Sequence, residues 1–137
     1  MTAQEFSDWE LDQPERHEFF RGEVFRVFGL GGARREHVRV TMNIARSLDN
    51  HLAGTPCQAF MADMKVHVEA TGDMFYPDIL VTYDPRDLCA SLEMQHPKLI
   101  IEALALSLKI THRIEQLGKV VNDVVGRCIF SLLLHVA

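Results

Sequence analysis

The sequence predicts a single domain of mixed α and β structure, an α/β fold in which helices flank a small mixed β-sheet. Three observations support this fold class. The 137 residues, of which 47% are hydrophobic and 24% charged, are enough for one hydrophobic core. Two stretches repeat their apolar residues every three or four positions, which indicates helices. Several shorter stretches are apolar throughout or alternate with period two, which indicates strands.

The first half of the chain predicts a strand pair and a long helix. Residues 18–28 are rich in aromatic and β-branched side chains and are interrupted at Gly22, as in two short strands joined by a turn. From 33 to 52 the apolar residues recur at helical spacing, which predicts an amphipathic helix of about five turns. Its apolar stripe consists of Val38, Met42, Ala45, Leu48 and Leu52.

Three strands are predicted to follow this helix. Apolar and polar side chains alternate towards the end of residues 57–70, as in a half-buried strand, and residues 71–73 form the next turn. Residues 76–83 and 98–104 are apolar on both faces, which is typical of strands inside a covered sheet. Residues 84–87 form a turn cluster between them.

The last part of the chain predicts one more helix and one more strand. Apolar residues recur at helical spacing from about residue 109 to residue 123. Residues 128–136 then form a short apolar run that resembles a strand.

Charge and composition exclude several classes of protein. A net charge of −5 argues against coating of nucleic acid through a general positive field, so any such contact would be local. The three cysteines form no C-x-x-C pattern, which predicts neither a disulfide framework nor a thiolate zinc site. No apolar run approaches the roughly 18 to 20 residues that span a bilayer. We therefore expect a cytoplasmic protein without membrane contact.

Two carboxylates lie in predicted buried strands. Asp78 opens one apolar run, and Glu102 lies within another. A buried acid must be paired, protonated or bound to a cation, and two acids on neighbouring strands form an oxygen-ligand site that suits Mg²⁺. The alternative is structural. Asp78 could form a turn or pair with an arginine, and Glu102 could form a buried ion pair with Lys109 or Arg113.

A basic group marks the start of the long helix. Arg34, Arg35 and Arg39 could bind phosphate together with the helix N-terminus, or they could form a solvated face. His37, in the same turn, could contact substrate or a catalytic group, or it could be a packing histidine.

Several motifs occur in a recognisable order. They are Arg21-Gly22-Glu23-Val24, His37 at the head of the long helix, Tyr76-Pro77-Asp78-Ile79-Leu80-Val81, Pro97-Lys98-Leu99-Ile100-Ile101-Glu102, and Arg113 eleven residues later. In this order the sequence resembles the Uma2 family (DUF820) of restriction-endonuclease-like proteins, within the PD-(D/E)xK nuclease superfamily. The resemblance covers roughly residues 5–120. Each motif alone is common, whereas their order and spacing are more specific.

The resemblance implies a restriction endonuclease-like core and a metal-dependent endonuclease that hydrolyses phosphodiester bonds in DNA. It assigns Asp78 and Glu102 as ligands of Mg²⁺ or Mn²⁺. Glu23 would add a carboxylate that binds metal or positions water. Arg113 would join the basic group and His37 in contacting nucleic acid.

The sequence departs from the family at the catalytic lysine. The family places this lysine on the helix that follows the second acid, where it orients the attacking water, but Gln116 occupies the position here. Glutamine donates hydrogen bonds without charge, and loss of one such electrostatic group typically costs about 10²- to 10³-fold in rate. Lys119 or Lys65 could substitute for the missing lysine.

The C-terminus is a second departure. Family members continue beyond this point, so the single domain of residues 1–137 looks C-terminally truncated, with an atypical tail at 124–137. The apolar tail must pair with the sheet, pack against a partner chain or promote aggregation. Homodimerisation would cover it.

Three functions therefore remain open. The first is a metal-dependent DNA endonuclease with full or weakened activity. The second is a catalytically inactive nuclease-fold protein that still binds nucleic acid, and Gln116 favours it. The third is a protein-interaction module that binds through its apolar tail.

Overall fold

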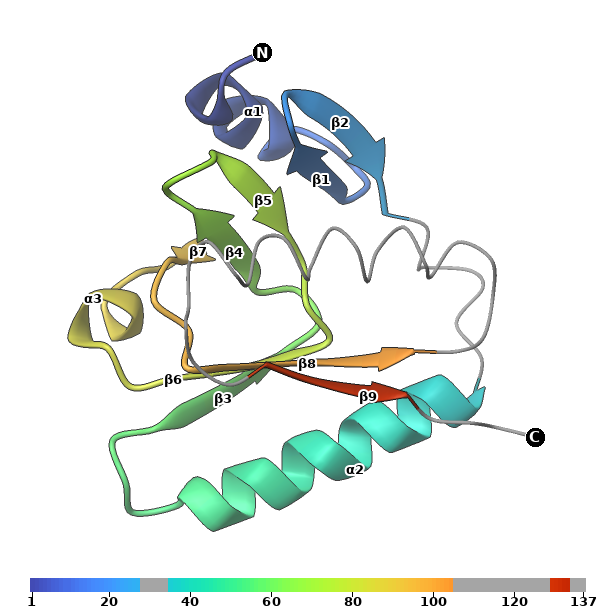
Figure 1. The fold of residues 1–137 in the computed structure, drawn as a ribbon, viewed down its shortest axis with the longest axis vertical. Helices are drawn as coiled ribbons and strands as arrows, with labels where there is room; N and C mark the ends of the chain where they lie inside the picture. Colours follow the sequence, from blue (N-terminus) through green and yellow to red (C-terminus); the bar gives the residue numbers. More distant parts are fainter. Residues whose placement is uncertain (28–34, 105–128, 134–137) are drawn as a thin grey trace.

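The computed structural model of the chain describes residues 1–27, 35–104 and 129–133. Its elements form four layers, in which two β-sheets are packed face to face between two helices (Figure 1). In chain order these elements are α1 (Ala3–Glu10), β1 (His17–Phe20), β2 (Glu23–Arg26), α2 (Arg35–Leu52), β3 (Gln58–Met61), β4 (Lys65–Val68), β5 (Asp73–Phe75), β6 (Ile79–Thr82), α3 (Pro85–Leu88), β7 (Glu93–Met94), β8 (Leu99–Leu104) and β9 (Ile129–Leu133).

Both sheets contain parallel and antiparallel strands. The five-stranded sheet has the order β2-β1-β5-β4-β7, and the four-stranded sheet has the order β3-β6-β8-β9. Only the pairs β4–β7 and β8–β9 are parallel among these described strands. The predicted fold class, mixed α and β with a mixed sheet, is confirmed, although the strands divide into two sheets. Within the part of the chain described, no helix is long and apolar enough to cross a bilayer.

The predicted strand pair is the β1–β2 hairpin. Arg21 and Gly22 form its two-residue turn, with φ angles of 50° and 82°. Two successive positive φ angles are typical of the turn whose twist matches that of the flanking strands, and glycine adopts the second at little cost. The N–H of Arg21 donates to Asp73 Oδ1 at 2.8 Å, which ties the turn to β5.

The N-terminal helix α1 covers the outer face of the five-stranded sheet. Its first turn is closed by a capping box, because the Thr2 hydroxyl accepts from the N–H of Glu5 and the Glu5 carboxylate accepts from the N–H of Thr2. Phe6 is fully buried and stacks on Phe19 with ring centroids 5.0 Å apart. Met74 completes this small cluster. The apolar periodicity of the sequence did not predict α1.

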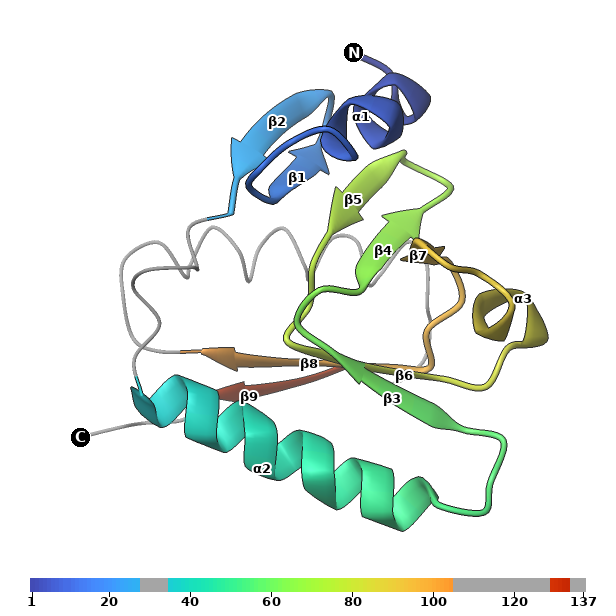
Figure 2. The same cartoon turned by 180° about the vertical axis from the view of Figure 1, so that it is seen from behind.

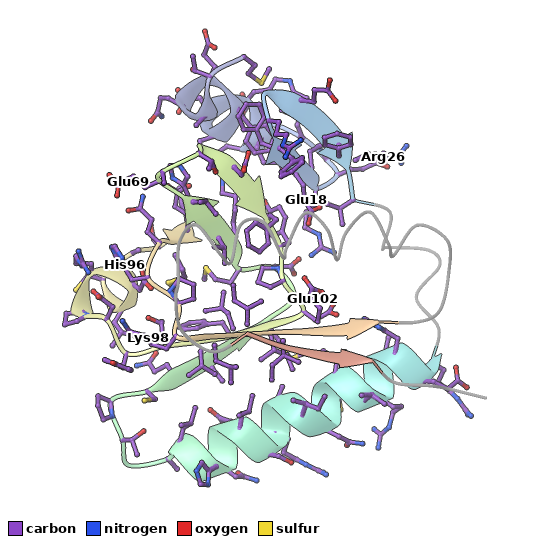
Figure 3. The ribbon with its side chains drawn as sticks, viewed as in Figure 1. Glu18, Arg26, Glu69, His96, Lys98 and Glu102 are labelled. Atoms are coloured by element: carbon purple, nitrogen blue, oxygen red, sulfur yellow. The ribbon has the colours of Figure 1, made fainter. Side chains whose placement is uncertain are left out.

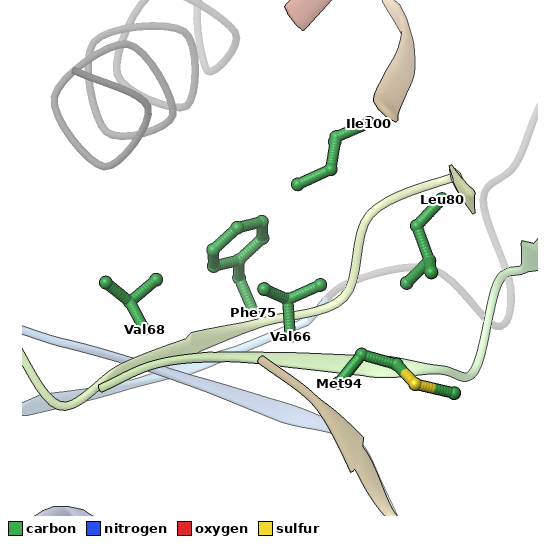
Figure 4. Close-up of a cluster of buried hydrophobic side chains, with 6 residues drawn as sticks. All are labelled: Val66, Val68, Phe75, Leu80, Met94 and Ile100. Atoms are coloured by element: carbon green, nitrogen blue, oxygen red, sulfur yellow. The ribbon is translucent and has the colours of Figure 1, made fainter. Parts of the chain in front are cut away.

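The main core lies between the two sheets. It consists of Val66, Val68, Phe75 and Met94 from the five-stranded sheet and Leu80 and Ile100 from the four-stranded sheet (Figure 4). Side chains alternate along β5, so Met74 faces α1 while Phe75 faces this core. Sequence patterning missed β5, since Asp73 was expected in a turn.

Helix α2 packs against the other face of the four-stranded sheet, near β3 and β8 (Figure 2). The predicted helix is confirmed, but its buried stripe is placed differently. Val38 and Met42 are each 48% exposed, whereas Thr41 is only 6% exposed. The expectation that Val38 and Met42 face the core was therefore wrong, because the sheet side of the helix start is formed instead by His37, Val40, Thr41 and Ile44.

The two apolar runs form β6 and β8, which are neighbours inside the four-stranded sheet. This confirms the prediction that both lie inside a sheet. Residues 129–133 of the apolar tail form β9, which pairs in parallel with β8. The tail is therefore joined to the sheet over these residues. The helix predicted at 109–123 lies outside the described residues.

A buried carboxylate fixes the segment that leads into β8. Asp87 is 2% exposed and accepts hydrogen bonds from the Thr82 hydroxyl at 2.9 Å and from the N–H groups of Gln95 and His96 at 2.9 and 3.0 Å. These contacts join the end of β6 to the segment before β8. They thereby hold the two strands that carry Asp78 and Glu102 in their relative positions.

We predict that Asp87→Ala lowers the free energy of unfolding by about 3 kcal/mol, because one buried and two part-buried donors lose a hydrogen bond to this carboxylate. The measurement is urea unfolding. The control is Asp63→Ala, because the Asp63 side chain is 79% exposed and pairs with Arg16 at the surface. The control should change stability by less than about 1 kcal/mol. Equal effects of the two variants would contradict the structural role of Asp87.

Candidate active site

The register between β6 and β8 places Asp78 beside Glu102. Ile79 lies opposite Ile101 and Leu80 opposite Ile100, so continuing the antiparallel ladder by one residue brings Asp78 opposite Glu102. Directly opposed residues have Cβ atoms about 4.5 to 5.5 Å apart. At that spacing two carboxylates can share one cation.

The two acids belong to the face of the sheet that looks towards the five-stranded sheet. Leu80 and Ile100 lie in the core between the sheets, and side chains alternate along strands, so the positions two residues away share that face. Figure 3 shows the Glu102 side chain leaving β8 on this side. The predicted placement of both acids on neighbouring strands is therefore supported by the strand pairing.

Burial differs between the two carboxylates. Glu102 is 5% exposed, whereas the Asp78 side chain is 22% exposed. Both have further interaction partners within the chain. A buried glutamate requires such partners or a cation. Asp78 is thus the member of the pair that remains open to solvent.

The segment that carries Asp78 is fixed on both sides. Pro77 is fully buried, and its ring restricts the backbone of this residue and of Tyr76. The N–H of Tyr76 donates to Glu18 Oε1 at 3.1 Å, and the carbonyl of Asp78 accepts from the N–H of Ala62 at 3.0 Å. The backbone around Asp78 is therefore held by both sheets.

His37 is the one predicted nucleic-acid contact that the described structure brings to Asp78. Its Nε2 atom lies 3.4 Å from Asp78 Oδ1, and its side chain is 28% exposed. The two residues come from the first turn of α2 and from the start of β6. His37 therefore contacts a candidate catalytic group, as one of the two sequence interpretations proposed.

Glu18, which the sequence analysis overlooked, lies closer to this site than Glu23. Glu23 is exposed at the start of β2, beside the hairpin turn, at the end of the hairpin that lies away from β8 (Figure 1). Glu18 extends from β1 towards the four-stranded sheet (Figure 3). Alternation could have identified it, because Phe19 faces α1 and its neighbour Glu18 must face the opposite way.

The predicted basic residues are distributed differently. Arg35 and Arg39 are exposed on α2, away from the sheet side occupied by His37 and Thr41. The other basic and amide residues of the predicted site lie outside the described residues. They are Arg34, Arg113, Gln116 and Lys119.

Lys65 contacts residues on the α1 side of the five-stranded sheet rather than the candidate site. It is 5% exposed, and its Nζ lies 3.3 Å from Ser7 Oγ and 3.7 Å from Glu93 Oε2. It also lies 5.9 Å from the centroid of the Phe6 ring, on the α1 side of the five-stranded sheet. The suggestion that Lys65 serves the catalytic site is therefore not supported by its contacts.

The donor set fits a hard, oxygen-seeking cation. Among the described residues, no three His, Cys, Asp or Glu side chains are grouped so that they could hold a metal ion. The carboxylate pair is the relevant feature instead. Mg²⁺ usually keeps several waters and binds through one or two carboxylates together with substrate phosphates. Asp78 and Glu102 are ligands of that chemical type.

A second buried carboxylate anchors the segment before Asp78. Glu10 is 8% exposed and accepts from the N–H of His17 at 2.7 Å and from the hydroxyl of Tyr76 at 3.3 Å. Burial, followed by the charge of Glu10 and the hydrogen bond to it, raises the pKa of Tyr76 well above its ordinary value of 10.0. Helix α1 thus holds the ring that lies two residues before Asp78.

Comparisons with known proteins agree with the motifs. Residues 3–119 match the model of the Uma2 family, which is described as "Putative restriction endonuclease". Two uncharacterized proteins of Synechocystis sp. are 30% identical over 113 residues and 29% identical over 109 residues. These alignments cover 82% and 78% of this chain but 58% and 60% of the relatives. The chain thus spans about three fifths of the length of these relatives.

A solved structure has the same fold. It is the crystal structure of "a putative nuclease belonging to DUF820" from Anabaena variabilis, with a TM-score of 0.66. The match covers 96% of this chain and 74% of that chain at 17% sequence identity. At this identity the likeness concerns the fold alone.

We predict that Tyr76 makes stability fall at high pH. Because its pKa is raised in the folded state, its contribution is complete below about pH 10 and is lost as the pH rises above that value. Wild type should exceed Tyr76→Phe in stability near neutral pH, and this difference should shrink above about pH 10. Chemical unfolding across this range tests the prediction. Parallel pH curves for the two proteins would contradict it.

Proposed function

The chain belongs to the Uma2 family, as its motifs predicted, and on this premise we propose that it is a metal-dependent endonuclease that hydrolyses phosphodiester bonds in DNA. The observation that supports the proposal is the β6–β8 register, in which Ile79 lies opposite Ile101, because one further step of this ladder would bring Asp78 opposite Glu102. Two carboxylates on adjacent strands, one of them open to solvent, form the kind of oxygen site that phosphodiester hydrolysis requires.

In this proposal Asp78 and Glu102 hold Mg²⁺ or Mn²⁺. When bound, such a cation lowers the pKa of a water molecule and neutralises charge on the phosphate. Asp78 is 22% exposed and faces the incoming substrate, while Glu102 is buried behind it. Glu18 fixes the Tyr76 backbone and therefore the position of Asp78. We retain Glu23 as a proposed carboxylate that binds metal or positions water, although its exposure at the start of β2 supports this role less than the contacts of Glu18 support a role for Glu18.

The remaining site residues of the proposal bind DNA or assist the reaction. Arg34, Arg35, Arg39 and Arg113 would contact phosphates by charge, and the exposure of Arg35 and Arg39 is compatible with that role. Gln116 would donate a hydrogen bond where the family has lysine, with Lys119 supplying positive charge nearby.

The second candidate is a nuclease-fold protein that has lost useful activity. Gln116 favours it, since a neutral amide replaces the expected lysine. Such a protein would act by binding nucleic acid or another protein.

We further propose that the protein is a homodimer and is located in the cytoplasm. Cys57 and Cys89 are free thiols, which agrees with a reducing compartment.

We predict that nicking of supercoiled plasmid depends on Mg²⁺ or Mn²⁺ and falls by at least about 10²-fold in Asp78→Asn and in Glu102→Gln, since each loses a charged cation ligand. The matched control is Glu69→Gln. Glu69 is exposed in the turn after β4, well away from Glu102 in Figure 3, and its replacement should leave nicking unchanged. Nicking that persists in Asp78→Asn would indicate a contaminating nuclease.

We also predict that Gln116→Lys raises the nicking rate, by up to about 10²-fold, because it restores the charge that the family uses at this position. The measurement is the initial rate of plasmid nicking at fixed Mn²⁺. Glu69→Lys adds the same charge at a distant exposed position and controls for tighter general DNA binding. If both lysine variants respond equally, or neither responds, Gln116 is not the cause of weak activity.

A further inference from the structure

The first turns of α2 direct two polar side chains towards the sheet. Its first two turns place His37 and Thr41 on the sheet side, whereas Val38 and Met42 are each 48% exposed. The half-buried Val40 and Ile44 lie on the same side of the helix as His37 and Thr41. The sheet side of α2 is therefore mixed, with apolar and polar side chains together, at the end of the helix nearest Asp78.

The buried polar face carries a cost of its own. Thr41 is 6% exposed, and its hydroxyl has no hydrogen-bond partner in the described structure. A buried hydroxyl without a partner is destabilising, and an isosteric valine would avoid the penalty. Apolar packing accounts for the side chains of Val40 and Ile44 on this face, but it does not account for a polar residue at position 41.

This rotation of α2 also brings His37 against Asp78. His37 Nε2 lies 3.4 Å from Asp78 Oδ1, and both side chains are about three quarters buried. A carboxylate oxygen accepts hydrogen bonds and an imidazole N–H can donate one, so the two side chains are chemically complementary at this approach. The orientation of α2 places the His37 ring beside the Asp78 carboxylate.

We propose that His37 is a positioning residue that fixes the Asp78 carboxylate for cation binding. This inference rests on the proposed metal-dependent function and adds to it a residue that acts through Asp78 rather than on the substrate. The backbone of Asp78 is already held by Ala62. His37 restricts the remaining freedom of the side chain, which is the freedom that a cation site must remove.

Calorimetric titration with Mn²⁺ in the absence of DNA tests this role. His37→Ala should weaken Mn²⁺ binding by about 10- to 100-fold, the range typical for loss of a group that orients a metal ligand. His37→Gln should recover most of the affinity, because its side-chain amide offers a neutral N–H donor near the position of Nε2. Asp78→Asn should abolish binding.

His67→Ala is the matched control. His67 also contacts a carboxylate, with Nδ1 2.9 Å from Glu93 Oε1, but it lies on β4 on the α1 side of the five-stranded sheet. Its replacement should leave Mn²⁺ affinity unchanged. Thermal unfolding of each variant establishes that the protein titrated is folded.

Each contrary outcome identifies what has failed. If wild type binds Mn²⁺ and folded His37→Ala binds it equally well, the positioning role is refuted while the metal site stands. If His37→Ala and His37→Gln lose affinity to the same extent, His37 is a direct ligand and the positioning role is again refuted. If wild type binds no Mn²⁺, the proposed metal-dependent function fails and the inference fails with it.

Discussion

The antiparallel register between β6 and β8 is the constraint on which the rest of the structure depends. Opposed pairs such as Leu80 and Ile100 lie in the core between the sheets, and extending the same register by one residue beyond Ile79 would bring Asp78 opposite Glu102. A slip of one residue would move every side chain of a strand to the other face. The apolar pairs that stabilise the fold therefore also set the spacing of the two carboxylates.

The candidate site lies where the chain passes from one sheet to the other. Tyr76 and Pro77 connect β5 of the five-stranded sheet to β6 of the four-stranded sheet. Glu18 and Glu10 hold Tyr76 from the side of the outer sheet, and His37 reaches Asp78 from α2. Residues 76–78 are thus contacted from α1, from the five-stranded sheet and from α2. The position of the Asp78 carboxylate therefore depends on how these layers pack.

The local pattern of apolar residues predicted the elements whose formation depends mainly on burying those residues. The uniformly apolar runs became β6 and β8, Gly22 marked the hairpin turn, and helical spacing identified α2. Helix α1 was missed because it carries few apolar residues, with Phe6 buried and Ala3 and Trp9 packed beside it, although Thr2 and Glu5 have the spacing of a capping box. The short strand β5 was missed because Asp73 is buried by accepting from the backbone of Arg21, which is distant in sequence.

In the candidate site, too, the sequence pattern identified only residues that stand out from their immediate neighbours. Asp78 and Glu102 stand out as acids in apolar runs, whereas the roles of Glu18 and His37 depend on contacts between layers that a linear pattern does not contain. The rotation of α2 is of this kind, since apolar spacing favoured burial of Val38 and Met42.

Anomalous diffraction from crystals soaked in Mn²⁺ tests the central claim most directly. The account predicts one peak bonded to carboxylate oxygens of both Asp78 and Glu102 at about 2.1 Å. A fully occupied peak elsewhere, with these two carboxylates bound only to protein groups, would contradict it.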